Sequence, residues 1–69
     1  MKVFYDVQQL LKSFGIVIYM KDRKHMLSMV DYEIRELKRL NLISQDDFIR
    51  AIAIIRKELN EENYERIDD

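Results

Sequence analysis

Apolar residues recur along most of this 69-residue chain three or four positions apart, which is the spacing of one helix face. This pattern predicts three helices, at about residues 7–14, 23–40 and 45–60. Between the first two, the run Ile16-Val17-Ile18-Tyr19 is β-branched and aromatic, but a single short strand would have no partner. We therefore expect an extended connector there. The pattern as a whole predicts an all-α fold, a compact three-helix bundle.

Polar residues that favour helix ends mark the boundaries. Aspartate and serine accept hydrogen bonds from the free N–H groups of a first helical turn, and the expected N-caps are Asp6, Asp22 and Ser44. Gln9 and Asp47 each follow a cap by three residues, the spacing of a capping box. Gly15 suits the left-handed residue that ends the first helix, and Asn41 suits the end of the second. A start one turn earlier would also fit the apolar face of the first helix.

The third helix is apolar over an unusually large part of its circumference. Its central stripe consists of Phe48, Ile52, Ile55 and Leu59. Ile49 and Ile54 project on the two flanks of that stripe. Either the connector or the first helix covers one flank, or the flanks form a homodimer seam or a surface for another protein.

Glu33 falls inside the apolar stripe of the second helix, among Met26, Met29 and Leu37. A buried carboxylate needs a partner, because an unpaired buried charge costs several kcal/mol. We expect Glu33 to be a buried structural carboxylate that bonds to Arg23, Tyr5 or Tyr19. A single carboxylate without a second acid or a placed histidine is weak evidence for catalysis.

Composition excludes several classes of function. The chain has no Cys and one His, so it offers neither a disulfide nor an ordinary zinc site. It has no Gly-rich phosphate loop and no recognisable nucleophile arrangement, so we expect a non-enzymatic protein without metal or cofactor. The N-terminal residues lack the apolar run of a signal peptide, and no segment is apolar for long enough to span a bilayer. We therefore expect a cytoplasmic protein with no membrane contact.

Charge is distributed unevenly although the net charge is only −1. Residues 1–45 hold eight Lys or Arg against five acids, whereas residues 46–69 hold four against eight. The acids gather where apolar residues become sparse. We expect residues 1–60 to form the bundle and residues 61–69 to form an acidic, frayed tail.

Several short runs give the chain a family resemblance: residues 4–12, 33–37 and 55–58, together with Gly15, Ile18-Tyr19, Asp22-Arg23 and Met29. In these runs the chain resembles the YqgQ-like family of small cytosolic bacterial proteins. The resemblance implies a three-helix bundle, no known enzymatic activity and a suggested role in binding single-stranded nucleic acid. The chain departs from the family pattern at Lys21, where a Gly usually precedes the Asp-Arg pair.

Positive charge and aromatic residues also gather around the connector. We predict a basic patch there, made of Lys12, Tyr19, Lys21, Arg23 and Lys24. Single-stranded nucleic acids bind to such combinations, because cations hold the backbone and aromatic rings stack on bases. The sequence pI of about 5.8 predicts that any such binding is weak and sensitive to salt. The alternative is a protein-interaction or homodimer module that uses Ile49 or Ile54.

Overall fold

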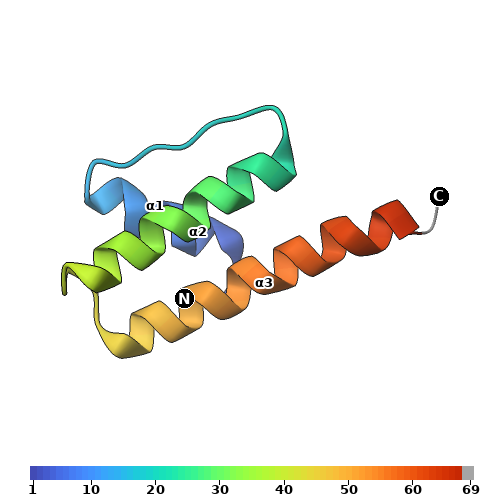
Figure 1. Cartoon of the computed structure of the whole chain (residues 1–69). Helices are drawn as coiled ribbons and strands as arrows, with labels where there is room; N and C mark the ends of the chain where they lie inside the picture. Colours follow the sequence, from blue (N-terminus) through green and yellow to red (C-terminus); the bar gives the residue numbers. More distant parts are fainter. Residues whose placement is uncertain (68–69) are drawn as a thin grey trace.

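Three α-helices account for most of the chain in a computed structural model: α1 (Phe4–Ser13), α2 (Arg23–Arg39) and α3 (Gln45–Ile67). The structure describes residues 1–67, and it describes side chains for residues 1–61. No strand occurs within residues 1–67. The most extensive helix contact joins α2 and α3, and α1 packs against both (Figure 1). The predicted all-α three-helix bundle is confirmed.

The start of α1 differs from the prediction. Val3, rather than Asp6, is the N-cap, and Asp6 lies in the first turn. The Asp6 carboxylate reaches back and accepts hydrogen bonds from the N–H groups of Lys2 at 2.8 Å and Val3 at 3.0 Å. These two bonds lower the pKa of Asp6. The earlier start brings Phe4 into the helix and into the core, where its side chain is 8% exposed.

The ends of α1 and α2 follow the predicted left-handed pattern. Gly15 has φ of 79°, and the N–H of Ile16 donates to the carbonyl of Leu11 at 3.0 Å. Gly15 N–H itself donates to a carbonyl in the last turn of α1, which completes a Schellman motif. Asn41, with φ of 60°, ends α2 with the same pair of backbone bonds.

Side-chain caps fix where α2 and α3 begin, as predicted. The Asp22 carboxylate accepts hydrogen bonds from the N–H groups of Lys24 at 3.1 Å and His25 at 3.4 Å. The Ser44 hydroxyl accepts from the N–H of Asp47 at 3.0 Å. Both helices therefore begin at the residue after their cap.

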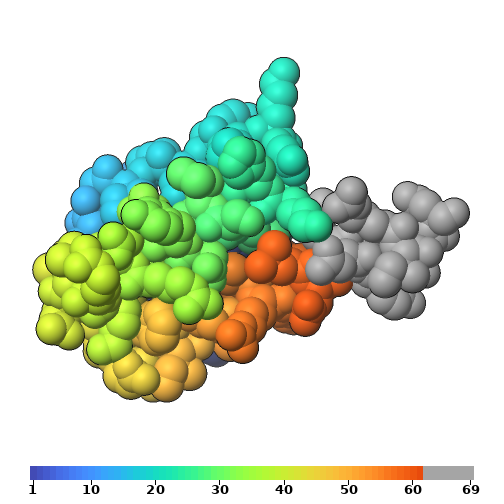
Figure 2. Space-filling model, in the orientation of Figure 1, coloured from blue at the N-terminus to red at the C-terminus, as the bar shows by residue number. Residues whose placement is uncertain are grey.

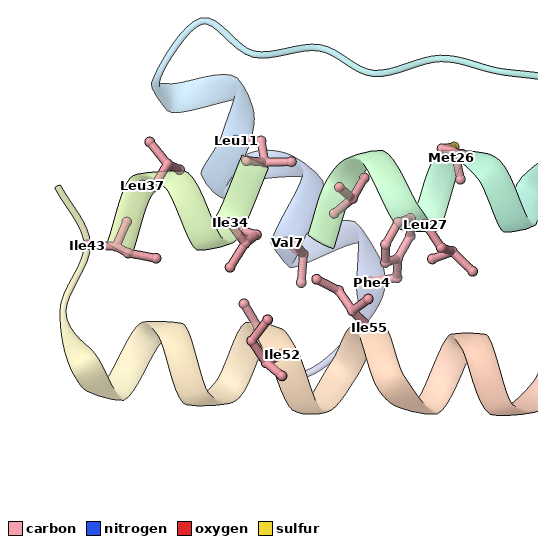
Figure 3. Close-up of a cluster of buried hydrophobic side chains, with 12 residues drawn as sticks. Phe4, Val7, Leu11, Met26, Leu27, Ile34, Leu37, Ile43, Ile52 and Ile55 are labelled. Atoms are coloured by element: carbon pink, nitrogen blue, oxygen red, sulfur yellow. The ribbon is translucent and has the colours of Figure 1, made fainter. Parts of the chain in front are cut away.

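The core lies where the three helices meet (Figure 3). Each helix contributes residues spaced by three or four positions, so the periodicity in the sequence is the physical origin of the bundle. The buried residues are Phe4, Val7, Leu11, Met26, Leu27, Val30, Ile34, Leu37, Ile43, Ala51, Ile52 and Ile55. Alternate residues of the connector, Ile16, Ile18 and Met20, pack against this cluster.

The prediction that Glu33 is buried is wrong. Among the residues whose side chains are described, no polar or charged one is buried, and Glu33 is half-buried at the edge of the core stripe. The expected stripe omitted Leu27, which is fully buried, and included Met29, which is 40% exposed. At about 100° per residue, exchanging these two positions rotates the stripe away from Glu33.

The first helix was expected to end at residue 14, but Phe14 is the C-cap of α1, which ends at Ser13, and Phe14 is 39% exposed. The acidic tail predicted for residues 61–69 lies almost entirely outside the part of the chain whose side chains are described. Within residues 1–67, no helix is both long enough and apolar enough to cross a membrane.

Candidate nucleic-acid interface

The connector (residues 14–22) presents alternate side chains to the core and to solvent. Ile16 and Ile18 face inward, whereas Val17 is 75% exposed and Tyr19 is 91% exposed. This alternation is characteristic of extended backbone, in which successive side chains point to opposite sides. The connector runs along the outer edge of the molecule from the end of α1 to the start of α2 (Figures 1 and 2). Tyr19 is therefore an aromatic side chain open to solvent on an anchored segment.

A pocket of about 240 Å³ lies between α1 and the connector. It brings together Lys12 from α1 and Tyr19 from the connector, two members of the predicted basic patch that are seven residues apart. The lining residues are Gln8, Gln9, Leu11, Lys12, Ile16, Val17, Ile18, Tyr19 and Val30. The pocket thus combines a cation, an aromatic ring and two side-chain amides.

The two glutamines were not predicted as site residues. Gln8 lies four positions before Lys12, so both fall on the same face of α1. That spacing was available from the sequence. What the sequence could not show is that the connector folds back along this face of α1 and closes the pocket.

The remaining members of the basic patch lie toward the other end of the connector. Lys21 belongs to the connector's last residues, and Arg23 and Lys24 begin α2. All three are exposed. At about 3.3 Å per residue, the five steps from Ile16 to Lys21 span roughly 17 Å of extended chain. The predicted patch is therefore an elongated row along the connector rather than one compact cluster.

Arg23 is already engaged by other groups of the protein. Its guanidinium donates to the Glu58 carboxylate of α3 at 2.8 Å and lies 5.5 Å from the centre of the Phe4 ring. Arg23 therefore does not pair with Glu33 as predicted. No described residue forms an ion pair or a side-chain hydrogen bond with Glu33, which correspondingly keeps part of its surface in solvent.

Lysines supply the unpaired positive charge of this region. Two arginines of α2 pair along their own helix, Arg35 with Asp31 at 2.8 Å and Arg39 with Glu36 at 2.6 Å. The Arg39 guanidinium lowers the pKa of Glu36. By contrast, no described acid lies within ion-pair distance of Lys12, Lys21 or Lys24.

The two flanking isoleucines of α3 have different environments. Ile49 is 56% exposed, whereas Ile54 is half-buried against the core. An open hollow of about 930 Å³ runs over the exposed face of α3. It is lined by Phe48, Ile49, Ile52, Ala53, Arg56, Lys57, Asn60 and Glu61. Ile49 therefore contributes to an exposed surface, and Ile54 does not.

Comparison with known proteins identifies relatives of this chain. The family model described as YqgQ-like matches residues 1–61, which is most of the chain. The chain belongs to the YqgQ-like family. It is 43% identical over 61 residues to "Uncharacterized protein YqgQ" of Bacillus subtilis (strain 168), a match that covers 88% of this chain and 86% of that protein. The region shared with the YqgQ-like family includes α1, the connector and α2, and therefore the whole predicted patch.

The chemical groups at these sites are those of ordinary polar and aromatic side chains. Within the described part of the chain, no group of three His, Cys, Asp or Glu side chains is placed to hold a metal ion. The groups around the α1–connector pocket are a lysine, a tyrosine and two amides. These groups can form hydrogen bonds and stack on rings. None of them is arranged as a nucleophile beside a general base.

Proposed function

We propose that the protein is a non-enzymatic binding protein that holds single-stranded nucleic acid in the pocket between α1 and the connector. The observation that carries this proposal is the 91% exposed Tyr19 beside Lys12 in one pocket. A solvent-exposed tyrosine on an anchored segment is poorly explained by packing, since it contributes nothing to the core. A nucleotide base could stack on the Tyr19 ring while the unpaired Lys12 neutralises the phosphate of the same nucleotide.

The chemistry of the pocket fits a single strand better than a duplex. Each base stacked on an aromatic ring contributes roughly 1–3 kcal/mol, and that face is available only when the base is unpaired. The side-chain amides of Gln8 and Gln9 can both donate and accept hydrogen bonds at a base edge. Lys21 and Lys24 extend the positive charge along the connector, in the direction that a flexible phosphate backbone would follow.

The whole-molecule charge limits the strength of this binding. A net charge of −1 supplies no general attraction for a polyanion, so binding depends on a few local lysines. With about three phosphate contacts, the observed affinity falls by tens of fold when salt rises about fourfold. We therefore expect weak binding at low salt and none measurable at high salt.

A titration of labelled single-stranded DNA and RNA oligonucleotides, followed by fluorescence anisotropy at two salt concentrations, tests the proposal. Lys12→Glu and Tyr19→Ala should each weaken binding about tenfold, because each removes one element of the pocket. Lys57→Glu is the matched control, since it makes the same charge change on the exposed face of α3. Equal losses for Lys12→Glu and Lys57→Glu, or no binding by the parent protein at low salt, would refute the proposed site.

A second candidate function is a protein-interaction module that uses the exposed face of α3. The open hollow around Ile49 favours it, because a 56% exposed isoleucine lies there beside Ala53 and the partly buried Phe48. Ile49→Glu should then abolish association with a protein partner and leave oligonucleotide affinity unchanged. Binding of the partner by the Ile49→Glu variant would exclude this face.

A further inference from the structure

The connector is a strand-like segment that has no strand beside it. Its residues Ile16 to Tyr19 are strand formers, exposure alternates from Ile16 to Met20, and this run contains no Pro or Gly. Within the described part of the chain, no backbone hydrogen bond involves residues 17–21. Unpaired N–H and C=O groups in such a row are a ready template for a second extended segment.

The two edges of the connector are not equivalent. The N–H of Ile16 points toward α1, because it donates to the carbonyl of Leu11 at 3.0 Å. In extended backbone, successive residues direct their N–H and C=O groups to opposite edges. The groups of Val17 and Tyr19 therefore belong to the edge that faces away from the end of α1. The connector itself lies along the outside of the molecule (Figures 1 and 2).

We propose that the free edge pairs with the same edge of a second copy of this chain, antiparallel and centred on Ile18. In this register Val17 lies opposite Tyr19 of the partner subunit, and Tyr19 lies opposite Val17 of the partner subunit. Each opposed pair exchanges two backbone hydrogen bonds, so this connector–connector seam contains four. This inference goes beyond the proposed function; both use the Tyr19 side chain, but the pairing does not use Lys12.

Self-complementarity is the reason to assign a second copy as the occupant. An antiparallel two-fold arrangement centred on Ile18 places an aromatic side chain against a β-branched one at both positions, which is a favourable cross-strand pair. Both side chains are exposed in the single copy, at 75% and 91%, so pairing requires no rearrangement of the core. Ile18 remains packed inward in both copies.

The arrangement closes after two copies. At the other edge, the N–H of Ile16 already donates to α1, and Lys21 at the end of the segment disfavours further strand addition. The seam is short and lies in the range of weak, transient interfaces. The dimer should therefore form in a concentration-dependent way, with a dissociation constant on the order of 0.1–1 mM.

Sedimentation velocity over a range of concentrations up to about 1 mM, without nucleic acid, tests the pairing. The double variant Val17→Lys with Tyr19→Lys should be monomeric throughout, because it places lysines opposite lysines across the seam. Val17→Pro should weaken the dimer about tenfold or more by removing one N–H donor per copy, whereas Val17→Ala keeps that donor and should retain most of the association. Ile49→Lys is the matched control on α3 and should dimerise like the parent.

Circular dichroism of each variant separates loss of pairing from loss of folding, since both substituted side chains are exposed. In a mixed sample of isotope-labelled and unlabelled protein, nuclear Overhauser effects between the Val17 methyl groups of one copy and the Tyr19 ring of the other should appear.

A parent protein that stays monomeric at the highest concentration overturns the proposal. A dimer that is lost in Ile49→Lys and kept in the double variant overturns it as well. Lys12→Glu should leave the dimer intact, so failure of nucleic-acid binding and failure of pairing are distinguishable.

Discussion

At the scale of single residues, Asp6 decides where the first helix begins. Its carboxylate accepts two backbone N–H bonds at the N-terminus of α1, which also places negative charge at the positive end of the helix dipole. The sequence contained this acid at capping-box spacing, but the same residue can serve as the cap or as the acid three positions after it. Burial of Phe4 selects the second arrangement.

The lowered pKa of Asp6 makes its contribution to stability depend on pH. Because the folded pKa lies below the unfolded one, the stabilisation is complete above the ordinary carboxyl pKa of about 4 and is lost as pH falls through the folded value. We predict that Asp6→Asn lowers the melting temperature at pH 7, and that the difference from the parent shrinks as the pH falls below the ordinary carboxyl pKa. Thermal denaturation followed by circular dichroism measures both. A difference that stays constant down to the lowest pH would contradict this assignment.

Gly15 is needed for its backbone conformation alone. Its φ is 79°, and no atom lies within 4 Å of the position that a Cβ would occupy. We predict that Gly15→Ala lowers the free energy of unfolding by about 1 kcal/mol through backbone strain, measured by urea denaturation. Asn41→Gly, at φ of 60°, is the opposite control and should leave stability unchanged or raise it. Similar losses in the two variants would show that the left-handed conformation is not the cause.

At the scale of helices, explicit caps made α2 and α3 predictable. Asp22 and Ser44 each accept the hydrogen bonds that their positions in the sequence imply. Which face of a helix packs against the core was harder to predict, because in α2 methionine occurs both inside and outside the buried stripe. Counting Met29 as core in place of Leu27 rotated the stripe and wrongly buried Glu33.

The corrected stripe of α2 predicts different effects for two neighbouring residues. Ile34 is fully buried, so Ile34→Val should lower the free energy of unfolding by about 1 kcal/mol. Glu33→Gln should change it by less than about 0.5 kcal/mol, because a half-exposed side chain without a partner loses little. Urea denaturation of both variants checks this. If Glu33→Gln lowered the free energy of unfolding as much as Ile34→Val or more, the result would support the original prediction that Glu33 is buried.

The ion pair between Arg23 and Glu58 joins the start of α2 to α3 and competes with any ligand for Arg23. At 44% and 23% side-chain exposure the pair is partly in solvent and is readily exchanged. We predict that Glu58→Gln raises oligonucleotide affinity about threefold at low salt, because it frees a cation at the end of the patch. Glu61→Gln makes the same charge change one turn further along α3 and should have a smaller effect. Anisotropy titrations compare them, and equal gains would mean that only net charge matters.

At the scale of the whole molecule, the sequence predicted the bundle and the extended connector, whereas the basic patch stays a prediction. The sequence could not predict how the patch is divided. Lys12 and Tyr19 share a pocket because the connector returns along α1, whereas Arg23 is drawn toward Glu58 by contacts between residues 35 positions apart. Such long-range arrangements depend on how the helices pack, which the periodicity of each helix does not specify.

The most direct test of the account is to map the binding site of a single-stranded oligonucleotide by amide chemical shifts of the labelled protein, at low salt and low protein concentration. We predict shifts at Gln8, Gln9, Lys12 and Tyr19, around the pocket between α1 and the connector, and none at Ile49 on the exposed face of α3. Shifts confined to α3, or a spectrum that does not change at saturating oligonucleotide, would contradict the claim that this pocket binds nucleic acid.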